Sequence, residues 1–118
     1  MVAVKRIVAN VAAERIHLAK AFHGDILGMT PVMDLGWIVT FAGEGSATPQ
    51  ISFATEGGSG TVVPDLSIEV DDLDDVYSRV LGAGLPIEYG PASEPWGVRR
   101  FYVRDLFGRL VNILAHEV

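Results

Sequence analysis

The chain contains no cysteine among its 118 residues. Disulfide bonds, thiolate nucleophiles and thiolate metal ligands are therefore excluded together, and any metal would need oxygen or imidazole ligands. No apolar run approaches the roughly 20 residues that cross a bilayer, and the start, with Lys5 and Arg6, does not resemble a secretory signal. These absences predict a cytoplasmic protein with no membrane partner.

Basic residues are also scarce. Nine Lys and Arg stand against 15 Asp and Glu, which gives a net charge of -6. A nucleic-acid-binding surface needs a basic stripe, so no nucleic-acid partner is expected. The apolar fraction of 49% is that of an ordinary globular protein, and a chain of this length forms one core. We therefore predict a single domain over residues 1–118.

The sequence repeats itself once in outline. Residues 26–32 (ILGMTPV) return about 55 residues later as residues 80–87 (VLGAGLPI), and residues 50–53 (QISF) correspond to residues 110–113 (LVNI). A repeat present only twice indicates two paired modules in one domain rather than an open array. We expect module one at residues 1–57, module two at residues 61–118, a flexible joint at residues 57–60 and a ligand between the modules.

Each module is predicted to contain a strand, a helix and three further strands. In module one, Leu18, Phe22 and Ile26 recur at helical spacing and Gly28 can end the helix, so we expect a helix from Ala13 to Leu27. In module two, the aspartates from Asp71 onwards open the second helix. The strands are expected at residues 4–11, 31–34, 37–41, 50–55, 65–70, 86–89, 99–104 and 110–115. The predicted fold class is α+β, with two paired βαβββ modules.

Three stretches carry a resemblance to a known family: residues 22–29 (FHGDILGM), 68–73 (IEVDDL) and 94–114 (EPWGVRRFYVRDLFGRLVNIL). Their order and spacing resemble the vicinal oxygen chelate superfamily, which includes glyoxalase I, extradiol dioxygenases and bleomycin-resistance proteins. The last stretch is most similar to bleomycin-resistance proteins, although Leu106 and Phe107 replace the usual residues. The resemblance spans essentially the whole chain. It implies the glyoxalase/bleomycin resistance/dihydroxybiphenyl dioxygenase fold and a homodimer.

The resemblance also implies a divalent metal held by one side chain from the first and one from the last strand of each module. By position these side chains are Arg6 and Ser52 in module one and Asp65 and Asn112 in module two. A guanidinium repels a cation, and hydroxyl and amide oxygens are weak ligands without charged partners. We therefore expect no metal and no other cofactor. Arg6 and Asp65 are predicted instead to form an ion pair, either structural or ligand-orienting.

Other candidate sites have simpler explanations. His17 and His23 lie six residues apart, about 240° around a helix, so they cannot clamp one ion from one face. They are interpreted, with His116, as surface or helix-end residues. The acidic stretch from Asp71 to Asp75 lacks the ligand spacing of a calcium loop and is explained by helix capping.

An aromatic and polar set suited to an organic molecule remains. Strand alternation places Arg100 and Tyr102 on one face and Phe101 on the other, with the face toward the ligand left open. The alternative for any single aromatic, including both tryptophans and Phe101, is burial in the core. The predicted ligand-binding residues are Trp37, Ser52, Asp65, Glu94, Trp96, Arg100, Tyr102 and Asn112.

The function predicted from these observations is metal-independent binding of a small planar or partly cationic organic ligand. Stacking on tryptophan and charge from Glu94 and Asp65 would supply the affinity. No catalytic residue is assigned. The alternatives are a metal-dependent lyase, isomerase or dioxygenase of the glyoxalase type, and a family member without a dedicated ligand.

Overall fold

The computed structural model describes residues 6, 8–46 and 52–117. The chain divides into two compact units, Met1–Thr55 (unit 1) and Glu56–Val118 (unit 2). The boundary lies just before the glycine-rich joint expected at residues 57–60. In the described residues no helix is both long enough and apolar enough to span a membrane.

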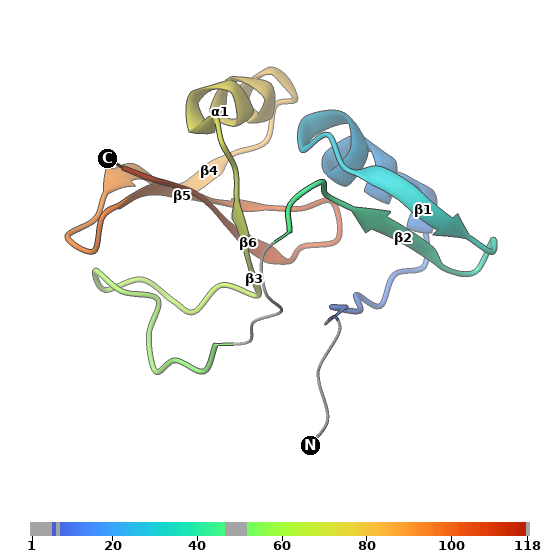
Figure 1. Ribbon diagram of the computed structural model, residues 1–118, viewed down its shortest axis with the longest axis horizontal. Helices are drawn as coiled ribbons and strands as arrows, with labels where there is room; N and C mark the ends of the chain where they lie inside the picture. Colours follow the sequence, from blue (N-terminus) through green and yellow to red (C-terminus); the bar gives the residue numbers. More distant parts are fainter. Residues whose placement is uncertain (1–5, 7, 47–51, 118) are drawn as a thin grey trace. The chain divides into compact units, whose positions relative to one another are not determined.

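Unit 2 has the element order predicted for module two (Figure 1). It consists of β3 (Leu66–Glu69), α1 (Leu73–Gly82), β4 (Ile87–Ser93), β5 (Val98–Arg104) and β6 (Leu110–His116). The sheet has the order β3-β6-β5-β4, in which β3 and β6 are parallel and the other neighbours are antiparallel. The βαβββ prediction is therefore confirmed for this module, with boundaries that shift by a few residues.

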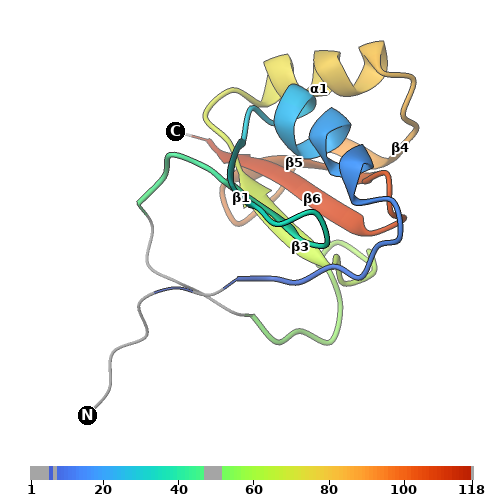
Figure 2. The ribbon, with the colours of Figure 1, turned by 90° about the vertical axis from the view of Figure 1, so that its right-hand side faces the viewer.

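One face of this sheet packs against α1 (Figure 2). The helix begins where the Asp72 carboxylate accepts the backbone N–H of Asp75 at 3.0 Å, which confirms the predicted capping. The Tyr77 ring of α1 meets the Phe101 ring of β5 edge-on, with 5.4 Å between their centroids. The fully buried side chains of unit 2 include Val80, Phe101, Val103, Val111 and Ile113. Phe101 thus belongs to the core, which was the alternative interpretation for this residue.

Unit 1 contains a short 3-10 turn η1 (Ile16–Leu18), a π-helix η2 (Lys20–Ile26) and an antiparallel hairpin of β1 (Thr30–Asp34) and β2 (Val39–Ala42). The helix is shorter than the predicted 13–27 segment. Its last turn has i→i+5 bonds, such as Leu27 N–H to the Phe22 carbonyl at 3.0 Å. Gly28 follows with φ +71°, so the predicted helix stop is confirmed, whereas of the predicted apolar stripe Phe22 is fully buried and Leu18 and Ile26 are half-buried.

Two strands predicted for module one are not found in the described residues of their segments. Arg6 and residues 8–11 of the expected 4–11 strand, and residues 52–55 of the expected 50–55 strand, have no strand conformation; the other residues of both segments lie outside the described ranges. A strand is stabilised by a ladder to a neighbour, and these residues have none. All of these residues except the half-buried Val11 are exposed instead, at 45% for Val8 and 90% for Phe53. The described part of the chain therefore has six strands and one α-helix, where eight strands and two helices were expected.

Candidate functional site

Four of the predicted ligand-binding residues meet on the face of the unit 2 sheet that does not pack against α1. Arg100 projects from the middle of β5, and Glu94 directly follows β4. Arg100 Nε and Nη2 each lie 2.7 Å from Glu94 Oε2, and both side chains are only 4% exposed. Arg100 Nη1 also donates to the Tyr102 hydroxyl at 3.1 Å. These residues form a buried ion pair with a hydrogen-bonded aromatic neighbour.

Three aromatic rings surround the guanidinium group. Arg100 Cζ lies 5.3 Å from the centroid of Tyr89, 5.1 Å from that of Trp96 and 5.0 Å from that of Tyr102. A cation at these distances is stabilised by the electron-rich faces of the rings. The place where aromatic rings would hold the cation of a ligand is thus filled by the protein's own arginine. Sequence analysis did not identify Tyr89, although the alternation of β4 indicates its face.

The ionisation of Glu94 is fixed by its surroundings. Burial raises the pKa of this carboxyl, but hydrogen bonds from Arg100, Ser59 and Tyr89 and the charge of Arg100 outweigh it, so the pKa of Glu94 is lowered. Ser59 Oγ donates at 3.0 Å and the Tyr89 hydroxyl lies 3.2 and 3.1 Å from the two carboxylate oxygens. Burial in turn lowers the pKa of Arg100, but the hydrogen bonds and charges of Glu94 and Tyr102 together outweigh it, so the pKa of Arg100 is raised. The two charges therefore compensate each other.

A loop at residues 57–62, the covering loop, lies on this polar face, on the side of the sheet opposite α1 (Figure 1). Arg100 Nη2 donates to the Gly58 carbonyl at 3.2 Å, and the Tyr102 hydroxyl donates to the Val62 carbonyl at 3.1 Å. Gly58 has φ +87°, and a Cβ there would lie 2.7 Å from the Trp96 ring. The prediction of a flexible joint at residues 57–60 was wrong, because side chains about 40 residues away in β5 hold this segment.

Asp65 and Asn112 hold strands together. Asp65 Oδ2 accepts the backbone N–H of Leu110 at 2.8 Å, and Asn112 Nδ2 donates to Ser67 Oγ at 3.1 Å. Asn112 Oδ1 is buried without a partner in the described part of the chain. One engaged carboxylate and one amide oxygen do not fit the charged donor set that the family's metal requires. The ion pair between Arg6 and Asp65 stays a prediction.

No three His, Cys, Asp or Glu side chains of the described residues are grouped closely enough to hold a metal ion. His23 is half-buried. Its ring centroid lies 5.2 Å from that of Phe22 and 6.1 Å from that of Phe41, which agrees with a packing role. His17 is exposed on the helix. His116 Nδ1 lies 2.8 Å from Glu69 Oε2 in an exposed pair at the end of β6.

Trp37 and Ser52 belong to unit 1. Trp37 is 75% exposed in the turn between β1 and β2, and Ser52 is exposed outside any strand. Trp96 in unit 2 is 51% exposed. The alternative interpretation that both tryptophans are core residues is therefore wrong, because each ring lies beside a turn that leaves one side open to solvent.

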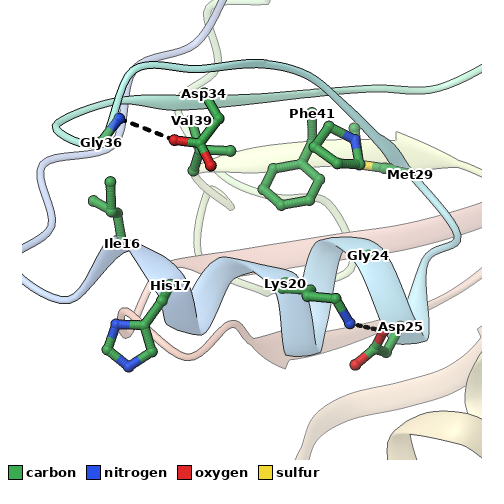
Figure 3. Close-up of a pocket in the computed structure, with 11 residues that line it drawn as sticks. Ile16, His17, Lys20, Gly24, Asp25, Met29, Asp34, Gly36, Val39 and Phe41 are labelled. Atoms are coloured by element: carbon green, nitrogen blue, oxygen red, sulfur yellow. Dashed lines mark hydrogen bonds and ion pairs between the residues drawn. The ribbon is translucent and has the colours of Figure 1, made fainter.

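Unit 1 contains a pocket of about 500 Å³ between its helix and its hairpin (Figure 3). We call it the helix–hairpin hollow. Sequence analysis missed it, although the four-residue spacing of Ile16, Lys20 and Gly24 places these residues along one side of the helix. A glycine inside a helix without a turn to explain it was the available signal. The hollow is lined by Ile16, His17, Lys20, Gly24, Asp25, Met29, Pro31, Asp34, Gly36, Val39 and Phe41.

Solved structures share this fold. TnmS3, described as an antibiotic binding protein from Streptomyces sp. CB03234, is 18% identical with a TM-score of 0.69, over 99% of this chain and 98% of that one. TioX from Micromonospora sp. ML1 is 20% identical with a TM-score of 0.63, over 95% and 96%. A lactoylglutathione lyase from Agrobacterium tumefaciens is 21% identical with a TM-score of 0.62, over 96% and 92%. At such identities the likeness establishes the fold alone.

A comparison with curated proteins finds no match. The sequence profile of one family, by contrast, matches residues 5–113, which is nearly the whole chain. Its span covers both modules, including the buried cluster of unit 2 and the hollow of unit 1. The chain belongs to the Glyoxalase/Bleomycin resistance protein/Dioxygenase superfamily.

Proposed function

We propose that this protein sequesters a small planar organic molecule without using a metal. The observation that carries the proposal is the Trp96 ring, which lies over the Arg100 guanidinium and against Gly58 while remaining 51% exposed. An aromatic surface that is already held in place loses little conformational entropy when a flat ligand stacks on it. The fold it shares with an antibiotic binding protein agrees with this function.

The compensated charges of Glu94 and Arg100 narrow the class of ligand that we expect. Because Arg100 neutralises Glu94, the cluster offers a cationic ligand little net attraction, and stacking contributes more than charge. Glu94, Arg100 and Tyr102 then support the surface, whereas Trp96 touches the ligand. The proposal keeps the other predicted ligand-binding residues, which are Trp37, Ser52, Asp65 and Asn112.

Metal independence rests on the chemistry of the donors in unit 2. Asp65 already accepts a backbone N–H, and Asn112 supplies only an amide oxygen. Binding by affinity alone needs no bond to be made or broken. The predicted homodimer and cytoplasmic location belong to the same proposal.

The two tryptophans of the chain allow a direct test. The Trp37→Phe variant leaves Trp96 as the sole tryptophan, and the Trp96→Phe variant leaves Trp37. Metal-free bleomycin and a set of uncharged planar aromatics are titrated with and without EDTA, while fluorescence is recorded. We expect quenching of Trp96, no effect of EDTA, and about tenfold weaker binding to Trp96→Ala by calorimetry, equivalent to ~1.4 kcal/mol.

Two results would contradict this function. Binding that requires added zinc, nickel or iron would favour the metal-dependent lyase or dioxygenase alternative. If no compound of the set binds, or if binding is unchanged in Trp96→Ala, the ligand does not stack on the Trp96 ring and the proposal is contradicted.

A further inference from the structure

We propose that the helix–hairpin hollow of unit 1 is a separate binding site for a small organic cation with an apolar body. This site goes beyond the proposed function, because it does not involve the Trp96 surface of unit 2 and is built from other residues. None of the residues predicted to bind ligand lines it.

The size and walls of the hollow suit such a molecule. Its volume of about 500 Å³ falls within the range of small-molecule pockets. The Val39 and Phe41 side chains point from the hairpin toward the helix (Figure 3), and Ile16 closes one end from the helix side. The walls are thus largely apolar, with an aromatic face available to an organic group.

Gly24 keeps the middle of the hollow open. A Cβ at this position would lie 3.6 Å from Phe41 Cε1 and 3.4 Å from Lys20 Cγ, which are ordinary van der Waals distances. A single methyl group therefore fits, whereas a longer side chain would project into the space between helix and hairpin. Glycine here leaves room for a ligand without being required by a positive φ.

The charge of the lining favours a cation. Lys20 Nζ pairs with Asp25 Oδ1 at 3.1 Å, so these two charges balance. Asp34 adds a carboxylate whose Oδ1 accepts the Gly36 N–H at 2.9 Å and which points into the gap in Figure 3. The formal charges of Lys20, Asp25 and Asp34 sum to one negative unit. The Phe41 face adds a further attraction for an organic cation.

The test uses three probes that share one ring and differ in charge: benzamidine, benzamide and benzoate. Each is titrated into the ¹⁵N-labelled full chain, and amide shifts are followed by NMR. We expect benzamidine to shift the signals of Gly24, Gly36 and Val39 and to bind at least about fivefold more tightly than benzamide. Benzoate should bind more weakly than benzamide. Equal affinity for the three probes, or shifts confined to unit 2, would overturn the proposal.

Matched variants distinguish binding inside the hollow from nonspecific binding elsewhere on the helix. Gly24→Leu should abolish the benzamidine shifts, while Ala21→Leu, on an exposed position of the same helix, should leave them unchanged. Asp34→Asn keeps an oxygen for the Gly36 N–H and should weaken benzamidine about fivefold without changing benzamide. If Gly24→Leu does not fold, which its amide spectrum would reveal, Asp34→Asn carries the test, and unchanged benzamidine affinity in that variant would overturn the proposal.

The two proposals fail independently. Trp96→Ala should leave benzamidine binding in unit 1 unchanged, because that ring belongs to unit 2. Loss of benzamidine binding in Trp96→Ala, or its survival in a folded Gly24→Leu protein, would rule out the helix–hairpin hollow as the site.

Discussion

The two units differ in how completely they bury their side chains. In unit 2 a four-stranded sheet packs against a helix on one face and is covered by a loop on the other, and Val111 and Ile113 have no exposed surface. In unit 1 every residue of β1 is exposed, and Val32 retains 60% of its surface. A two-stranded hairpin with one short helix cannot bury both of its faces. Unit 2 therefore buries much of its apolar surface within itself, whereas the described residues of unit 1 leave apolar surface open.

The charged pairs differ in the same way. The Glu94–Arg100 pair of unit 2 is 4% exposed on both sides, whereas the Lys20–Asp25 pair of unit 1 is 76% and 63% exposed. An exposed pair contributes at most about 1 kcal/mol, but removing one partner of a buried pair leaves an uncompensated charge. Charge substitutions should therefore affect unit 2 far more than unit 1.

The largest expected effect comes from Arg100→Met. This change leaves Glu94 buried without its cation and releases the Gly58 carbonyl, so we expect the free energy of unfolding to fall by about 3–5 kcal/mol. Denaturant titration of the Trp37→Phe background, followed through Trp96, measures the change.

A matched control lies on the same strand. Arg104 pairs with Glu88 at 2.7 Å, but the two side chains are 49% and 37% exposed, so Arg104→Met should cost no more than about 1 kcal/mol. If the free energy of unfolding falls by similar amounts in the two variants, burial does not decide how much such a pair contributes. The electrostatic difference inferred between the units would then be wrong.

A smaller effect is expected from pH. The pKa of Glu94 is lowered in the folded chain, so its contribution to stability is present above the unfolded pKa and is lost as pH falls through the folded value. Protonation weakens the ion pair but leaves a hydroxyl and an acceptor oxygen, so the loss should be smaller than that in Arg100→Met. Thermal unfolding between pH 7 and pH 3 measures it, and Glu94→Gln should have the flatter profile. A profile identical to that of the unchanged chain would exclude this carboxyl as the cause.

Much of unit 2 could be predicted because its signals are local. Alternation along β5, the Asp72 cap and the glycine that ends the β5–β6 turn each act within a few residues. The first and last strands of module one lack this advantage, since a strand depends on a partner that its own sequence does not specify. Pattern alone therefore places a helix or hairpin more readily than a strand that pairs over a long distance.

The candidate site was predictable in part for the same reason. Glu94, Trp96, Arg100 and Tyr102 are near neighbours in sequence, so their grouping in unit 2 follows from one turn and one strand. Their actual contacts depend on Ser59 and the covering loop, 35 or more residues away, which no local pattern indicates. As a result, the sequence does not reveal that the rings of this cluster surround the protein's own guanidinium.

The smallest expected effect concerns unit 1 and has the opposite sign. Gly24→Ala adds a Cβ at ordinary contact distance inside η2, where alanine loses less conformational entropy than glycine, so the free energy of unfolding should rise by about 0.5–1 kcal/mol. Gly28→Ala is the matched control: φ is +71° there, so the same methyl group should destabilise by about 1 kcal/mol. Trp37 fluorescence in the Trp96→Phe background measures both, and equal changes would mean that the backbone of unit 1 differs from the one described. The same variants are then made in the Trp37→Phe background, where Trp96 reports on unit 2. If they also move the Trp96 transition, the two units unfold together and the single domain predicted for residues 1–118 is supported, whereas an unmoved transition would mean that unit 2 folds on its own.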